Sequence, residues 1–213
     1  MAPLTLVMAT RNTGKVREMA ELLRDLGVRL LSLADFPEIA DIPEEGDTFA
    51  ENALAKAKIV ARLTGLPALA DDSGLEVEAL GGRPGVHSAR YAQDRTGGTT
   101  PKDADNWQKL LDELREVPLD KRQARFVCEI ALSFPDGRLI TTRGELAGVI
   151  ALAPRGTWGF GYDPVFYVPE YQAMVAELDL ATKNHISHRG EALQKLKEIL
   201  AARKEEFFAD PPQ

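Results

Sequence analysis

The apolar positions at the start of the chain follow two different patterns. Residues 4–9 are mostly apolar, and after a polar stretch at 10–15 the apolar side chains return at helical spacing as far as Leu26. A short apolar run bounded by a polar turn is typical of a buried strand, whereas the 3.6-residue period indicates a helix, which Gly27 would end. The sequence therefore begins with a strand, a polar turn and a helix.

The pattern continues along the rest of the chain. Thr48 and Glu51 form a capping-box pattern, so a helix is expected to begin there and to end at Gly65. The other predicted elements are strands at 28–33, 68–70, 125–134, 138–145 and 165–168 and helices at 102–116 and 189–207. Helices alternate with strands early and a hairpin follows, which predicts a mixed α/β sheet. We expect one domain over residues 1–213, with no repeat and no separable linker.

Composition excludes some classes of function. The chain has 213 residues and a formal net charge of −7, so a long basic groove for a nucleic acid polymer is not expected. No apolar run approaches the length that spans a membrane, and no signal peptide is recognisable. Cys128 is the only cysteine, which favours a reducing compartment and a buried core position. The expected location is the cytoplasm.

The polar turn at 10–15 has the composition of an anion site. Thr10, Asn12 and Thr13 precede a helix whose first amides and dipole attract anions, and Lys15 adds a positive charge. The P-loop pattern is not met, because Val16 stands where that pattern needs a magnesium-binding hydroxyl. Taken alone, the turn is better explained as a helix cap at Thr13 followed by a surface lysine.

Two adjacent acids follow the predicted strand at 68–70. Asp71 and Asp72 would lie at the carboxyl end of a sheet, where open α/β proteins place their sites. Their side chains should point in different directions, so that one could bind a metal while the other orients the loop. The alternative is a turn with Gly74 as its hinge, but a turn needs only one of the acids. A functional role is therefore favoured.

Further candidates occur in loops and at helix ends. Glu44 and Glu45 could bind a metal or simply form a solvated acidic loop, and Lys56 alone is best explained as a surface lysine. Phe160 or Tyr162, in the segment GFGYDP, could stack on a purine, although packing in the core is the better explanation for either ring alone.

The segment KNHISHRGEAL places Lys183, His185, His188 and Arg189 just before or at the start of the final helix. With His87 these include every histidine of the chain, but no zinc pattern is present. Donors at a helix N-terminus fit a phosphate or a keto oxygen better. Cations, magnesium-type carboxylates and an aromatic turn together favour a Mg²⁺–nucleotide site.

Five segments occur in an order and at a spacing that resemble one known family, the inosine/xanthosine triphosphate pyrophosphatases. They are ATRNTGKVREMAELL, TFAENALAKA, ALADDSGLEVEALGGRPGVHSARYA, GFGYDPVF and SHRGEAL. The resemblance covers nearly the whole chain. It implies two lobes on a long curved mixed sheet flanked by helices, with the nucleotide in a cleft between the lobes. It also implies a homodimer that uses Mg²⁺ to convert ITP, dITP or XTP into the monophosphate and pyrophosphate.

The resemblance assigns roles to residues of this sequence. Asp72 resembles the catalytic acid, a metal ligand and proton acceptor, and Glu44 resembles the second magnesium carboxylate. The residues that resemble phosphate or other substrate contacts are Thr10, Arg11, Asn12, Thr13, Gly14, Lys15, Lys56 and Ser73. Those that resemble base and ribose contacts are Phe160, Gly161, Tyr162, Asp163, Lys183, His188 and Arg189. Among these, His188 and Arg189, together with backbone amides, are expected to donate to the purine 6-keto oxygen.

One departure and two alternatives accompany this assignment. The family commonly has Gly where Arg11 stands, so Arg11 either alters the tightness of the turn or adds a positive charge beside the cleft. A non-catalytic nucleotide-sensing module would lack a catalytic carboxylate, whereas Asp72 and Glu44 are both present. A Maf-like pyrophosphatase acting on modified pyrimidines is disfavoured by the segment SHRGEAL.

Overall fold

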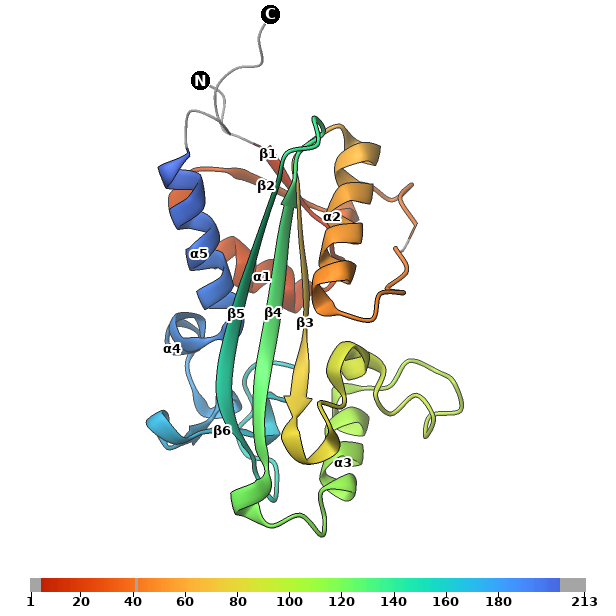
Figure 1. The fold of residues 1–213 in the computed structure, drawn as a ribbon, viewed down its shortest axis with the longest axis vertical. Helices are drawn as coiled ribbons and strands as arrows, with labels where there is room; N and C mark the ends of the chain where they lie inside the picture. Colours follow the sequence, from red (N-terminus) through yellow and green to blue (C-terminus); the bar gives the residue numbers. More distant parts are fainter. Residues whose placement is uncertain (1–4, 41, 204–213) are drawn as a thin grey trace, which may run out of the picture. The chain divides into compact units, whose positions relative to one another are not determined.

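The computed structural model describes residues 5–40 and 42–203, apart from the side chain of Asp25 (Figure 1). Leu4, in the first predicted strand, and residues 204–207 of the last predicted helix lie outside the described part of the chain. The strands are β1 (Thr5–Met8), β2 (Arg29–Ser32), β3 (Ala68–Val77), β4 (Gln123–Ser133), β5 (Leu139–Ile150), β6 (Phe166–Val168) and β7 (Ala173–Met174). The α-helices are α1 (Thr13–Leu22), α2 (Phe49–Thr64), α3 (Asp103–Glu113), α4 (Leu180–Ile186) and α5 (His188–Ala202).

The strands form one mixed sheet in the order β2-β1-β3-β4-β5-β6-β7. β1 runs parallel to β2 and β3, whereas β6 runs antiparallel to β5 and β7. In the β1–β3 pair, Met8 lies opposite Leu69, and the N–H of Ala9 donates to the carbonyl of Leu69. The chain therefore leaves β1 for the polar turn beside the place where β3 reaches Asp71. The prediction of an α/β mixed sheet flanked by helices is confirmed.

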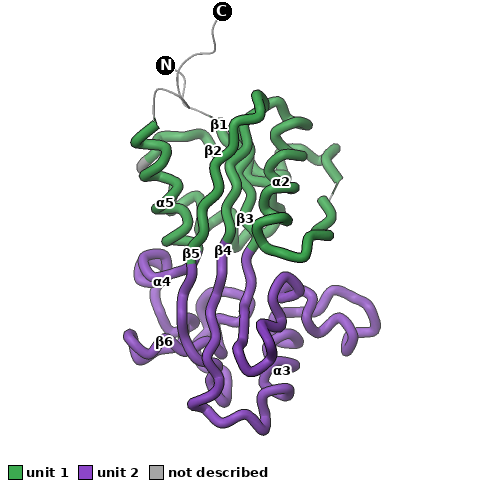
Figure 2. The backbone as a smooth tube through the Cα atoms, in the orientation of Figure 1, with its two compact units in different colours: residues 1–72, 129–144, 189–213 green, residues 73–128, 145–188 purple. Residues whose placement is uncertain are grey.

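The chain forms two compact units, each assembled from separate segments (Figure 2). Unit 1 comprises Met1–Asp72, Glu129–Gly144 and Arg189–Gln213, and unit 2 comprises Ser73–Cys128 and Glu145–His188. Three strands, β3, β4 and β5, have residues in both units. The chain consequently passes from one unit to the other after residues 72, 128, 144 and 188.

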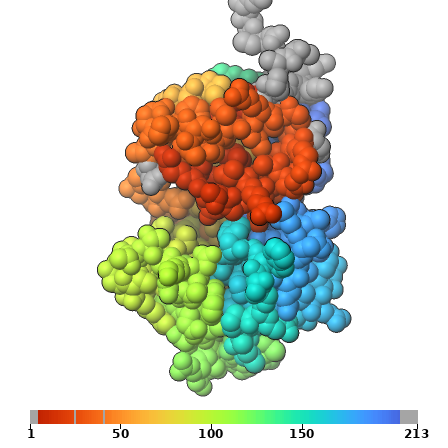
Figure 3. Space-filling model, turned by 180° about the vertical axis from the view of Figure 1, so that it is seen from behind, coloured from red at the N-terminus to blue at the C-terminus, as the bar shows by residue number. Residues whose placement is uncertain are grey.

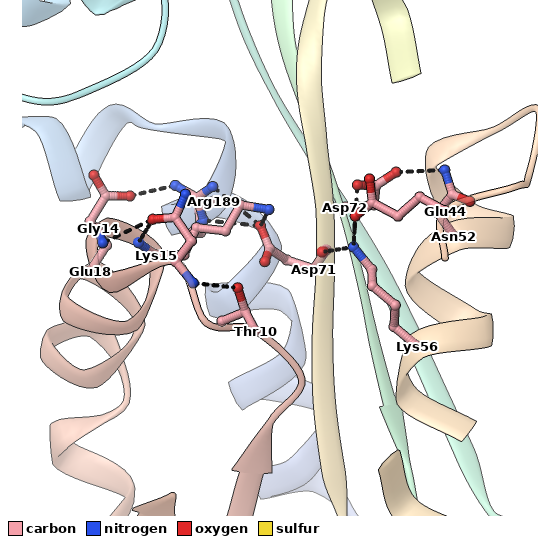
Figure 4. Close-up of polar contacts among 11 residues, drawn as sticks. Thr10, Gly14, Lys15, Glu18, Glu44, Asn52, Lys56, Asp71, Asp72 and Arg189 are labelled. Atoms are coloured by element: carbon pink, nitrogen blue, oxygen red, sulfur yellow. Dashed lines mark hydrogen bonds and ion pairs between the residues drawn. The ribbon is translucent and has the colours of Figure 1, made fainter. Parts of the chain in front are cut away.

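Unit 1 owes its core to small side chains on α2. Thr48 and Glu51 form the predicted capping box, and Gly65 ends the helix in the left-handed conformation with φ 67°. Ala53, Ala57 and Ala61 repeat every four residues and are buried against β1, β3 and β4. Alanines at this spacing let the helix backbone come close to the sheet. In the close-up of this unit, α2 lies on one side of β3 while α1 and α5 lie on the other (Figure 4).

The core of unit 2 is built from larger side chains than the core of unit 1. Its buried cluster includes Leu75 of β3, Leu110 of α3, Phe126 of β4 and Phe166 of β6. On one face of this unit, the yellow-green segment around residue 100 and the cyan segment that follows β5 lie side by side (Figure 3). A hydrogen bond from the N–H of Gly161 to Asp103 Oδ2 (2.7 Å) joins these two segments.

Two predicted strands were too short and one helix was not predicted. β5 does not end at residue 145 but continues to Ile150. β3 does not end at residue 70 but continues to Val77, so Asp71 and Asp72 lie inside a strand. Lys183 and His185 belong to a separate short helix, α4, which Asp179 caps by accepting from the N–H of Thr182. Cys128 is fully buried in β4, as expected. None of the helices in residues 5–40 and 42–203 has the length and apolar character needed to cross a membrane.

Candidate active site

The polar turn at 10–15 closes on its own side chains. Asn12, not Thr13, is the N-cap of α1, and its Oδ1 accepts from the N–H groups of Gly14 (2.9 Å) and Lys15 (3.1 Å). Thr10 Oγ1 accepts from the N–H of Asn12 (3.1 Å). These bonds hold the first amides of α1 in the arrangement that helix N-termini use for anions. A bound phosphate would accept from the N–H groups of Gly14 and Lys15, which now donate to Asn12.

A buried ion-pair network lies beside this turn. Lys15 Nζ is 3.0 Å from Asp71 Oδ2, and the same oxygen is 3.2 Å from Arg189 Nη2 (Figure 4). Arg189 also pairs with Glu18 of α1, and its side chain is 2% exposed. Two cations and two carboxylates thus neutralise one another below the turn, which makes their burial tolerable.

A second group of contacts surrounds Asp72 on the other side of β3 (Figure 4). Asn52 Nδ2 donates to Asp72 Oδ2 (3.0 Å), and Lys56 Nζ donates to Asp72 Oδ1 (3.3 Å). Lys56 also donates to Glu44 Oε1 (2.7 Å) and to the carbonyl of Asp71 (2.8 Å). Lys56 is 6% exposed, so it is not the surface lysine that its position alone suggested.

The charges of this group shift one another's proton affinity. Burial raises the pKa of Asp72 and Glu44 adds to the rise, while Lys56 and Lys15 act against it. Burial acts to lower the pKa of Lys56, but Asp72, Asp71 and Glu44 outweigh it, so that this pKa is raised. A carboxylate whose pKa is raised is a better proton acceptor, and the lysine next to it stays charged.

The alternation of side chains along β3 explains why Asp71 and Asp72 contact different residues. Successive side chains of a strand point to opposite faces of the sheet, so Asp71 meets Lys15 and Arg189 while Asp72 meets Asn52 and Lys56. The expectation that the two carboxylates diverge is therefore confirmed, although the predicted position at a strand end is not.

Sequence reasoning missed Asn52 and left Asp71 without a partner. Asn52 binds Asp72, accepts from the N–H of Gly46 (2.8 Å) and so ties the loop of Glu44 to α2. A usable signal was present, because Asn52 and Lys56 are four residues apart and share one face of the helix. Asp71 pairs with Lys15 and with Arg189, and Arg189 is 118 residues away, so no local pattern could indicate that pair.

The aromatic turn of unit 2 is held by Asp163. Its Oδ2 accepts from the N–H of Phe160 (2.9 Å) and pairs with Lys183 Nζ (2.7 Å), which lies 4.6 Å from the centre of the Phe160 ring. Gly159 has φ +83°, and a Cβ on it would fall 2.0 Å from Asp163 Oδ2. The turn therefore requires glycine at 159 and presents a half-buried aromatic ring beside a lysine.

Two further rings of unit 2 are packed in its interior. Tyr162 is 5% exposed and donates its hydroxyl to the carbonyl of Ser88 (2.8 Å), while Ser88 Oγ accepts from the N–H of Leu75 (2.9 Å). The better explanation for Tyr162 from sequence, packing in the core, is thus confirmed. His188 is buried and stacks on Phe126 with ring centres 4.9 Å apart.

The predicted site residues fall into one set in each unit. Unit 1 brings together the turn at 10–15, Glu44, Lys56, Asp72 and Arg189, and unit 2 brings together Phe160, Asp163 and Lys183. Ser73 follows Asp72 in β3 and is half-buried, whereas Glu45, His87 and His185 are exposed. The Arg11 guanidinium donates to the carbonyls of Leu33 and Ile39. A nucleotide cleft between lobes stays a prediction.

The carboxylates of unit 1 have the chemistry that magnesium requires. Glu44 Oε1 and Asp72 Oδ1 both lie within 3.3 Å of Lys56 Nζ, so the two carboxylates converge on one point. Within the described residues no group of three or more His, Cys, Asp or Glu side chains could hold a metal. Magnesium typically takes only one or two protein carboxylates and completes its shell with water and substrate phosphates, so the pair fits.

Comparisons with known proteins find relatives that match this chain over most of its length. The Ham1 family model matches residues 6–199. A protein of Geobacter sulfurreducens called dITP/XTP pyrophosphatase is 56% identical over 195 residues, which cover 92% of this chain and 96% of that one. A protein of Desulforamulus reducens with the same name is 53% identical, covering 92% and 94%.

Solved structures give the same result. A HAM1 protein from Coxiella burnetii is 47% identical with a TM-score of 0.83, covering 93% of this chain and 99% of that one. The Ham1 protein of Staphylococcus aureus is 38% identical with a TM-score of 0.82, again covering 93% and 99%. The match over nearly the full chain, in sequence and in fold, shows that this protein belongs to the Ham1 family.

Proposed function

We propose that this protein hydrolyses the non-standard purine nucleoside triphosphates ITP, dITP and XTP to the monophosphate and pyrophosphate, and so removes them from the nucleotide pool. The observation that carries the proposal is the buried group in which Asp72 is held by Asn52 and Lys56 beside Glu44. It is supported by relatives at 53–56% identity that are called dITP/XTP pyrophosphatases.

The proposed roles follow from the contacts of each side chain. Asp72 accepts a proton from the attacking water, a role that its raised pKa favours. Lys15 and Lys56 supply positive charge near the phosphates, and the turn at 10–15 offers backbone amides to their oxygens. Phe160 stacks on the base beside Lys183. Ser73, His188 and Arg189 remain proposed substrate contacts, as do Gly161, Tyr162 and Asp163, which shape the aromatic turn.

We also propose that Glu44 and Asp72 hold Mg²⁺. When bound, the ion supplies positive charge that neutralises phosphate oxygens and the leaving pyrophosphate. The Lys56 ammonium is already bonded to both carboxylates and holds them in position. The test uses Mn²⁺ in place of Mg²⁺ and measures its binding by calorimetry. A Glu44→Gln variant should bind Mn²⁺ at least about tenfold more weakly than the unaltered protein. Equal affinity would remove Glu44 from the metal site.

A nucleotide panel tests the reaction. The protein, with Mg²⁺, is incubated with ITP, dITP, XTP, ATP, GTP and UTP, and pyrophosphate and orthophosphate are measured separately. We expect pyrophosphate from the first three at rates well above those for ATP and UTP. Binding without turnover would favour a nucleotide-sensing module, and preference for UTP would favour a pyrimidine-directed enzyme. Orthophosphate as the first product would mean that the wrong bond has been assigned.

Replacing the proposed base tests the assignment within the site. The Asp72→Asn variant keeps the shape of the side chain and a hydrogen-bonding oxygen, so we expect a folded protein with kcat lower by at least about a hundredfold. Its far-ultraviolet circular dichroism should match that of the unaltered protein. Asp120→Asn, at an exposed position in a 3₁₀ turn, serves as the control and should keep full activity. Retained turnover in Asp72→Asn would contradict the proposed role.

The remaining proposals concern assembly and location. We propose a cytoplasmic homodimer, on the resemblance stated above and on the exposure of large apolar side chains at Leu152 (66%) and Trp158 (71%). Light scattering after size exclusion should give twice the chain mass of 23.3 kDa. Monomers at micromolar concentration would contradict the dimer, and recovery of the protein outside the cytoplasmic fraction would contradict the location.

A further inference from the structure

Arg11 makes contacts that a phosphate-binding arginine would not need. It lies in the turn at 10–15, and its Nη1 donates to the carbonyl of Leu33 (2.7 Å) while its Nη2 donates to the carbonyl of Ile39. A third bond runs the other way, from the N–H of Leu33 to the carbonyl of Thr10 (3.4 Å). Both terminal nitrogens of the guanidinium are therefore bonded to the backbone of one neighbouring segment, residues 33–39.

The backbone at Arg11 accommodates a side chain without strain. Among the described non-glycine residues, only Gln172 has a positive φ. The conformational freedom of glycine is therefore not required at position 11, and the turn keeps its shape with an arginine there.

Segment 33–39 is a firm support for the turn. Leu33 and Ile39 are 4% and 6% exposed and belong to the buried cluster that also contains Ala9. Ser32 and Asp35 cap the short 3₁₀ helix at Leu33–Asp35, which fixes the backbone from which the first carbonyl projects. The same segment leads directly into the loop that carries Glu44. A guanidinium bonded to two carbonyls holds them more firmly than an ammonium would, because its donors are held in a rigid fork.

We propose that Arg11 is a positioning residue, which fastens the phosphate turn to segment 33–39 and orders the turn before the ligand binds. Its effect on the nucleotide passes through the backbone of residues 10–15 and not through its own charge. The identity of the ligand, a polyphosphate chain, rests on the proposed function. Ordering the turn in advance lowers the entropy cost of binding, so its loss should appear as weaker binding and not as slower chemistry.

Hydrogen exchange tests the tie without any reference to activity. Arg11→Met removes the donors and the charge, Arg11→Lys keeps the charge, and Arg17→Met removes an exposed arginine from α1 as the matched control. We expect amides of residues 10–15 and 33–39 to exchange about tenfold faster in both Arg11 variants, and no change in the control. Unchanged exchange in Arg11→Met would overturn the proposal, whatever the protein hydrolyses.

Steady-state kinetics then separates positioning from direct contact. With ITP we expect KM to rise about five- to tenfold in Arg11→Met and in Arg11→Lys, with kcat within about twofold of the unaltered protein. The dependence of log KM on log salt should stay the same in Arg11→Met, because the lost charge does not face the phosphates. If Arg11→Lys restores KM and Arg11→Met flattens the salt dependence, Arg11 binds the ligand directly and the proposal fails. Absence of turnover in the unaltered protein would instead count against the proposed function and leave the exchange result standing.

Discussion

Arg189 illustrates how far the role of a residue can depend on its partners. From sequence it resembled a base contact, yet its side chain is 2% exposed and joined to Glu18 and Asp71. A guanidinium in this position neutralises two buried carboxylates and holds α5 against α1 and β3. Its proposed contact with the nucleotide would have to be made from within that network.

Removing Arg189 should therefore lower the stability of the folded protein. In Arg189→Met the carboxylates of Glu18 and Asp71 lose their shared partner inside the protein, and we expect unfolding free energy to fall by about 3–5 kcal/mol. Urea denaturation followed by circular dichroism measures the loss. Arg17→Met should change it by less than about 0.5 kcal/mol. Adding Glu18→Gln to Arg189→Met should recover part of the loss, and a loss below about 1 kcal/mol in Arg189→Met would contradict the network.

Individual residues show where sequence reasoning worked. Asp72, Glu44 and Lys56 were candidates from the sequence, the resemblance gave each a role, and the structure places both carboxylates within 3.3 Å of Lys56 Nζ. Arg11 was expected either to alter the tightness of the turn or to add charge beside the ligand, and the structure shows its guanidinium donating to the carbonyls of Leu33 and Ile39. The difference arises because a sequence shows which groups are present, whereas the direction of a long side chain depends on segments that fold beside it.

Elements show a similar limit. The capping box at Thr48 and the stop at Gly65 define α2 to the residue, because both signals are local. β3 was expected to stop at residue 70, since Asp, Ser and Gly are poor strand formers. It continues to Val77 because β4 pairs with it along the sheet, a contact between residues far apart in sequence. The short helix α4 was missed because its seven residues hold too few apolar positions to show a period.

The N-cap of α4, Asp179, should make stability depend on pH in the acidic range. Bonds from the Thr182 N–H and hydroxyl hold the pKa of Asp179 below its usual range. A carboxylate whose pKa is lowered by folding contributes stability above its unfolded pKa of about 3.9, and this contribution is lost as the pH falls through the folded pKa. Asp179→Asn keeps a capping oxygen that does not titrate. We therefore expect the difference in urea midpoint between the two proteins to shrink as the pH is lowered from about 6 to about 3.

A matched variant distinguishes this cap from a general effect of charge. Glu116→Gln removes an exposed carboxylate that makes no ion pair within the described part of the chain. Its difference from the unaltered protein should show no comparable trend with pH. A parallel trend in both variants would mean that overall charge, and not the cap, controls the acid response.

The molecule as a whole joins its two units through shared strands. β3, β4 and β5 each have residues in both units, so neither unit can lose its strands without affecting the other. This arrangement could not be deduced from the sequence, which lacks a linker and gives no sign of where the chain passes between units. It follows from three long strands whose full lengths appear only when they pair.

Shared strands should make unfolding a single event. Both tryptophans, Trp107 and Trp158, lie in unit 2, whereas α1, α2 and α5 supply most helical signal from unit 1. We expect urea transitions followed by tryptophan fluorescence and by circular dichroism to coincide. In Arg189→Met, which alters only unit 1, both midpoints should fall together. A fluorescence midpoint that stays in place would show that the units unfold independently.

The ion pair between Asp71 and Arg189 also has a consequence for synthesis of the chain. The two residues are 118 positions apart, and translation at about 5–20 residues per second needs roughly 6 to 24 s to cover that distance. Throughout that interval the nascent chain already carries Asp72, Glu44 and Lys56 but not the arginine that neutralises Asp71 and Glu18. The part of unit 1 that carries Asp72, Glu44 and Lys56 is thus translated early, but its ion pairs can be completed only late. A chain released before α5 would carry the proposed chemistry without the arginine that supports it.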